Sequence, residues 1–364
     1  MKKFILYAVL IVPMVVFSQQ DLGERLDDVT KKTDKFNAYL NFQSSFDAVS
    51  EKGADTRLGF KARQLRLEFR GDITDKIFYR LRHRLNKSNA AADLGNLADA
   101  TDMMYAGFHL NEKWTLTAGK MCQMWGGFEF DLNPMNIYEY SDFVNAMDNF
   151  MVGGMITYMP TENHELIFQI TNSRNHSLEN VYGTALPAHI KASNSPLAYI
   201  LNWNGNLFDG KFQTRYAIGL ETEAKNTYST MITLGNRLNL ENFQVFLDYM
   251  YAKQDLDRLY LSQVKEITTA LENVSYNTFI LKAEYQPAEK WNLFAKGMYE
   301  TGNYKSEKVR TSYGYYCGVE FLPFKEQDLR FFLAYIGRTF DYKGGTSHNT
   351  NRFSLGMMYR IKAF

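Results

Sequence analysis

From Phe36 onward, apolar and polar side chains alternate with a period of two residues, and this alternation recurs along the whole chain. One clear example is 243–251, where Phe243, Val245 and Leu247 alternate with Gln244 and Asp248. Side chains of a β-strand point alternately to its two faces, so each such segment predicts a strand with one apolar and one polar face. The fold must therefore place one face of every strand in an apolar environment and the other face in a polar one.

The pattern predicts sixteen strands, at residues 36–47, 57–72, 76–88, 101–111, 113–121, 151–160, 163–173, 195–204, 211–222, 227–239, 242–253, 275–286, 290–302, 311–323, 328–340 and 350–364. Short polar turns such as 111–113 and 239–242 follow even-numbered strands. Long segments such as 89–100, 122–150 and 174–194 follow odd-numbered ones. This rhythm is typical of an antiparallel transmembrane β-barrel. Its sheet must close, because an open edge in lipid leaves backbone groups without hydrogen bonds. We therefore expect an all-β, sixteen-stranded antiparallel barrel.

The first residues have the features of a secretory signal peptide. Lys2 and Lys3 precede an apolar run from Phe4 to Phe17, and Ser18 is a small residue suited to cleavage. The run is shorter than the roughly 20 residues that a spanning helix needs. We expect a signal peptide at 1–18, a short periplasmic segment at 19–35 and a barrel at 36–364, located in the outer membrane of a bacterial cell.

Composition agrees with a barrel in lipid. Aromatic residues make up 15% and charged residues 22% of the chain, which suits an outer surface with aromatic girdles. Without Lys2 and Lys3, 41 − 2 = 39 basic residues face 40 acidic ones, so the global charge gives no reason to expect a nucleic-acid partner. A soluble all-β protein is the alternative, although its strands are usually shorter.

The sequence offers no catalytic motif. Six histidines are scattered, at positions 83, 109, 164, 176, 189 and 348, and Cys122 and Cys317 belong to no CxxC or zinc pattern. HExxH, GxSxG, Walker A and GxGxxG are absent from the sequence. We therefore expect no enzyme activity, no catalytic residue, no metal site and no cofactor.

A series of basic residues lies on the polar faces of the second and third predicted strands. We call it the basic ladder: Lys61, Arg63, Arg66, Arg70, Arg80, Arg82 and Arg84. The alternation breaks at Gln64–Leu65, as it does at a β-bulge. Period two directs the ladder into the lumen, where rows of Arg and Lys attract anions. Facing lipid instead, each charge would cost about 2–4 kcal/mol near the bilayer midplane.

Segment 122–150 is the longest connection, and its acids are candidates for a constriction: Glu129, Asp131, Glu139 and Asp142, with Asp148 beyond them. Two outcomes remain open. The ladder keeps a net positive charge, or these acids neutralise it. The same segment holds Trp125, Phe128, Phe130, Tyr138 and Tyr140. These aromatic side chains either stack on solutes or pack the loop against the barrel wall, and the second interpretation is favoured.

Three stretches resemble the phosphate-selective porin O and P family: FKARQLRLEFRGDITDKIFYRLRHRLNK at 60–87, WTLTAGKMCQMWGGFEFDLNPMNIYEYSDF at 114–143, and the hairpin 151–173. The resemblance implies a sixteen-stranded, trimeric barrel whose long third loop folds into the lumen. It also implies an anion pathway of arginine and lysine side chains, without fixing the solute.

Two functions follow from these observations. The first is a porin for passive diffusion of small solutes, biased by the ladder toward anions such as phosphate, with outer-membrane lipid, small anionic solutes and two further copies of the chain as partners. The second is a barrel whose lumen is occluded and which acts as a surface binding or scaffold protein.

Overall fold

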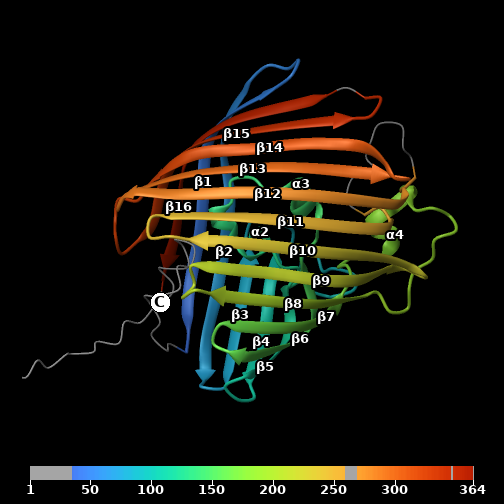
Figure 1. The fold of residues 1–364 in the computed structure, drawn as a ribbon, viewed down its shortest axis with the longest axis horizontal. Coiled ribbons are helices and arrows are strands. Elements are labelled where there is room, and N and C mark those ends of the chain that lie inside the picture. Colours follow the sequence, from blue (N-terminus) through green and yellow to red (C-terminus); the bar gives the residue numbers. More distant parts are fainter. Residues whose placement is uncertain (1–34, 259–268, 346, 364) are drawn as a thin grey trace, which may run out of the picture.

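The computed structural model describes residues 35–258, 269–345 and 347–363 of the 364-residue chain. These residues form one closed antiparallel barrel, in which each strand pairs with its sequence neighbours and β1 pairs with β16 (Figure 1). The sixteen-stranded barrel predicted from the alternation is thereby confirmed. The predicted signal peptide and nearly all of the segment 19–35 lie outside the described residues.

The sixteen strands of the described residues are β1 (Asn37–Glu51), β2 (Arg57–Thr74), β3 (Ile77–Arg84), β4 (Thr101–His109), β5 (Trp114–Cys122), β6 (Phe150–Thr161), β7 (His164–Asn172), β8 (Leu197–Leu207), β9 (Phe212–Ala224), β10 (Thr227–Asn239), β11 (Phe243–Leu256), β12 (Glu272–Ala288), β13 (Trp291–Tyr304), β14 (Glu307–Phe321), β15 (Asp328–Tyr342) and β16 (His348–Lys362). Short helices are α2 (Phe128–Asp131), α3 (Asp142–Ala146) and α4 (Leu178–Tyr182), with 3-10 turns η1 (Pro134–Asn136) and η2 (Gly183–Ala185). Within the described part of the chain, no helix has the length and apolar character needed to cross a membrane.

The alternation in sequence becomes an alternation in exposure. Along β10, Ser229, Met231 and Thr233 are buried inside the barrel, whereas Ile232 and Leu234 are exposed on its outer face. Backbone pairing on both sides of each strand satisfies the groups that an open edge would leave unpaired. The outer face is therefore available to lipid, and polar side chains are directed inward.

The strands differ in length around the barrel. β3 to β7 are mostly eight or nine residues long, whereas β11 to β16 have 14 to 17. Several strands continue beyond their predicted ends: pairing of β1 with β16 extends to Glu51, four residues past the predicted end at 47. Backbone hydrogen bonds continue there after the apolar alternation has stopped. β3 instead ends at Arg84 rather than at 88, because the chain leaves the sheet before Thr101 begins β4.

Turn chemistry closes the hairpins. Only Lys305 and Ser306 separate β13 from β14, and both have positive φ, 49° and 64°. Two consecutive residues with positive φ match the right-handed twist of the flanking strands. This connection and the equally short one between β9 and β10 are exceptions to the predicted long loops after odd-numbered strands.

Candidate functional site

The connection between β5 and β6, residues 123–149, packs against the inner faces of strands from β7 to β16; we call it the long loop. It enters through Gly126 and Gly127, whose φ values are 70° and 73°, a region that favours glycine. Trp125, only 1% exposed, packs there against Gly219 of β9. A Cβ built on Gly219 would lie 2.2 Å from Cζ3 of Trp125. The absence of a side chain at Gly219 thus makes room for the indole.

Two carboxylates from the barrel wall hold the helix N-termini of the long loop. Asp248 of β11 accepts hydrogen bonds from the backbone N–H groups of Phe128 and Glu129 at 2.9 and 2.8 Å. Glu300 of β13 accepts them from Asp142 and Phe143 at 2.6 and 2.9 Å. The first N–H groups of a helix have no partner within it, and they favour a negative charge. Both helices are therefore fixed to the wall by the same device.

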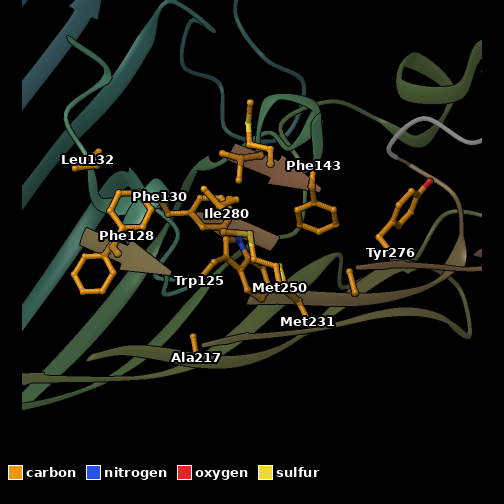
Figure 2. Packing of buried hydrophobic residues seen from close by; sticks show 14 of the residues in the cluster. Trp125, Phe128, Phe130, Leu132, Phe143, Ala217, Met231, Met250, Tyr276 and Ile280 are labelled. Atoms are coloured by element: carbon orange, nitrogen blue, oxygen red, sulfur yellow. The ribbon is translucent and has the colours of Figure 1, made fainter. Parts of the chain in front are cut away.

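The aromatic residues of the long loop form part of an apolar core inside the barrel. Trp125, Phe128 and Phe143 lie in one cluster with Met250 and Ile280, among others (Figure 2). In a second cluster the rings of Tyr138 and Phe294 stack 4.4 Å apart. The loop aromatics thus pack against the wall, as the favoured interpretation expected.

The four predicted constriction acids all have basic partners on the wall, outside the basic ladder. Asp131 lies 2.9 Å from Arg215, and Glu139 lies 2.9 Å from Arg352 and 3.5 Å from Arg338.

The other two acids are held as closely. Glu129 pairs with Lys296 and accepts a hydrogen bond from the backbone N–H of Ser141 at 3.0 Å. Asp142 pairs with Arg310 and also with Arg338. These ion pairs join the long loop to β9 and to β13–β16. Sequence reasoning missed these basic partners, because nothing in the sequence indicates which wall residue a loop acid will meet.

Five members of the basic ladder come together on β2 and β3. The strand register places Arg66 opposite Arg84 and Arg70 opposite Arg80, with Arg82 between the two on β3. All five line a cavity of about 1060 Å³ that runs between β2–β6 and the long loop.

The remaining two ladder members do not line that cavity. Arg63 pairs with Asp47 and donates a hydrogen bond to Ser45 Oγ at 3.0 Å. Lys61 is opposite Ser45 in the register and is exposed. The register shift that interrupts β2 leaves Arg63 as the extra residue, so the bulge predicted at Gln64–Leu65 begins one residue earlier.

An acid that sequence reasoning missed lies among the ladder residues. Asp102 of β4 is 1% exposed, and its carboxylate lies 2.6 Å from Arg84, 3.2 Å from Arg82 and 3.6 Å from Arg66. Three guanidinium groups against one carboxylate leave 3 − 1 = +2 at this point of the wall. Glu68 pairs with Arg80 at 2.9 Å.

The connection between β3 and β4 meets the connection between β7 and β8 beside the cavity, near the end of the ladder at Arg84. His176 Nε2 lies 3.0 Å from Asp99, and both residues line the cavity. Asp93 accepts hydrogen bonds from the Ser177 backbone N–H at 2.7 Å and from the Asn180 amide at 2.6 Å. These bonds lower the pKa of Asp93 below its ordinary value, because they favour the charged carboxylate.

Solved structures with the same fold include three outer-membrane proteins. The channel DcaP of Acinetobacter baumannii has a TM-score of 0.65 and 12% identity, covering 90% of this chain and 97% of that one. An anion-selective porin from Comamonas acidovorans has a TM-score of 0.60 and 13% identity, covering 90% and 99%. OmpT of Vibrio cholerae, described in a trimer form, has a TM-score of 0.57 and 11% identity, covering 90% and 100%.

At these identities the likeness concerns the fold alone. A search of curated proteins gives no significant sequence match. The family model for phosphate-selective porin O and P, in contrast, matches residues 36–361, nearly the whole chain. The protein therefore belongs to the phosphate-selective porin O and P family.

Proposed function

We propose that the protein is a porin of the bacterial outer membrane, which lets small solutes diffuse through its lumen and carries out no chemistry. Membership of a porin family and a closed sixteen-stranded barrel support this function. The outer face carries many exposed apolar side chains, such as Leu201, Ile218 and Leu355, that suit contact with lipid. A cleavable leader at 1–18 would direct the chain across the inner membrane.

The solutes in this proposal are preferentially small anions, phosphate among them. The observation that carries it is the excess of guanidinium groups around Asp102, with a net charge of 3 − 1 = +2 beside the cavity. A low-dielectric wall strengthens the attraction of such a charge for anions. The constriction acids Glu129, Glu139 and Asp142 have their own partners on β13–β16, so they leave the ladder charge in place.

We also propose that three copies assemble into a homotrimer. Support comes from the fold, since one similar solved structure is described as a trimer form. Each copy would then supply its own lumen, with its own long loop and ladder.

The second candidate function is an occluded barrel that serves as a surface binding or scaffold protein. The observation in its favour is the apolar core that the long loop forms with β8–β13, which fills that side of the lumen. Under this alternative the cavity beside β2–β6 would not connect the two sides of the membrane.

Liposome swelling distinguishes these proposals. We expect vesicles containing the purified protein to swell faster in phosphate than in an uncharged solute of similar size. Arg82→Ala should reduce this advantage, and Arg57→Ala should not, because Arg57 is exposed outside the cavity. Absence of swelling in every solute would contradict the porin and favour the occluded barrel. Equal rates for both solutes would contradict the anion preference alone.

A further inference from the structure

The cavity that holds the ladder has a second, chemically different lining. Six methionines contribute to it, out of 16 in the chain. They come from β4, β5, β6 and the long loop: Met103, Met121, Met124, Met147, Met155 and Met159. Methionine side chains are flexible and polarisable, so they adapt to apolar bodies of different shape. The ladder side of this cavity is cationic, and the adjoining side is apolar.

The strand register shows that the β6 methionines face the lumen. Met155 is opposite Thr117 and Gln169, and Gln169 accepts a hydrogen bond from the long-loop backbone N–H of Met124 at 2.8 Å. The next pair along the strands, Ile156 and Phe168, points outward. Met155 and Met159 lie five and nine positions beyond Phe150 on β6, roughly 17 and 30 Å along the strand, whereas Met103 of β4 is paired with Arg82 and lines the same cavity.

Charge and apolar surface meet at Phe150. Its ring centroid lies 5.3 Å from the guanidinium carbon of Arg82 and 6.0 Å from that of Arg84, and the ring lines the cavity. A solute whose anionic group reaches the ladder therefore has its remaining atoms beside an aromatic ring and thioethers. Inorganic phosphate has no apolar surface and gains nothing from such neighbours. A solute with a hydrocarbon part does gain from them.

We infer that this cavity binds carboxylates with an apolar body, such as medium-chain alkanoates, during their passage, and binds them better than small inorganic anions. The carboxylate lies at Arg82 and Arg84, and the hydrocarbon part lies along Phe150 and Met103. This inference rests on the proposed porin function and names the class of anion that the ladder receives.

The wild-type protein alone tests the inference. In a planar bilayer in KCl, sodium acetate, butyrate or hexanoate is added and the concentration that halves the current is measured. Each additional methylene buried against the thioethers strengthens binding, so hexanoate should act at a concentration at least about tenfold lower than acetate. Equal half-block concentrations along the series, or no block by any member, would overturn the inference.

Paired variants locate the apolar contact. Met103→Gln with Phe150→Gln should remove most of the difference between hexanoate and acetate, whereas the same positions changed to Leu should retain it. The reversal potential in a KCl gradient should be alike in both double variants, because neither changes a charge. If chloride selectivity is present and the chain-length series is flat, the inference fails while the porin proposal stands. If the protein conducts without chloride selectivity, the anion preference itself has failed.

Discussion

The carboxylate of Asp102 lies 2.6 Å from Nε of Arg84. The same carboxylate is also within 3.6 Å of Arg82 and of Arg66, so one acid stands among three cations. Its position on β4, beside the ladder on β3, makes the balance of charge a property of the rigid wall. The long-loop acids Glu129 and Glu139 are instead paired with Lys296 and Arg352.

Asp102→Asn should increase anion selectivity. The change removes one negative charge while keeping the side-chain shape, so the local net charge rises from +2 to +3. A unit charge about 8 Å from an ion, at intermediate dielectric, changes its energy by about 1 kcal/mol, or severalfold in permeability ratio. Reversal potentials under a KCl gradient measure this ratio. Glu51→Gln, an equal change of charge outside the cavity, is the control. A ratio that falls in Asp102→Asn would refute the assignment.

Lys296→Met should destabilise the barrel strongly. Lys296 and Glu129 are 4% and 1% exposed, so the substitution leaves a carboxylate without its cation in the barrel interior. Removing one partner of a buried pair typically costs about 3–5 kcal/mol. Urea unfolding in lipid vesicles, followed by tryptophan fluorescence, measures the loss.

The double variant Lys296→Met with Glu129→Gln provides the control for this pair. It removes both charges and keeps a side chain that can accept from Ser141, so it should recover most of the lost stability. A double variant no more stable than Lys296→Met would mean that the charge of Glu129 is not the cause.

Gly219→Ala should weaken the packing of the long loop against β9. The added Cβ would lie 2.2 Å from Cζ3 of Trp125, and overpacking of this kind typically costs about 1–3 kcal/mol. Gly297→Ala is a matched control, since a Cβ built there meets nothing within 4 Å. The free energy of unfolding in urea should fall for Gly219→Ala and stay within about 0.5 kcal/mol of wild type for Gly297→Ala. Equal effects at the two glycines would contradict the packing of Trp125.

The strands were predictable because a barrel in lipid enforces the period-two alternation at every strand. The same parity places Arg80, Arg82 and Arg84 on one face of β3, and the pairing of β3 with β2 agrees with that placement. Asp102 was not predictable in this way. A register shift between Arg82 and His83 leaves Asp102 as the extra residue on β4, so counting along the strand does not give its direction.

The partners of the long loop were also beyond the sequence. Glu139 bonds to Arg352, 213 positions later, and Glu129 to Lys296, 167 positions later. Such pairs depend on the three-dimensional path of a loop whose own residues show no regular period. Its aromatic content did predict packing against the wall, because large apolar side chains seek burial whatever path the loop takes.

The reversal potential of the unmodified protein under a KCl gradient tests the central claim most directly. With a net positive charge beside the cavity, the potential should lie on the side of the chloride equilibrium potential. A reversal potential on the potassium side would contradict the account, because acidic groups rather than the arginines of β2 and β3 would then govern the passage of ions.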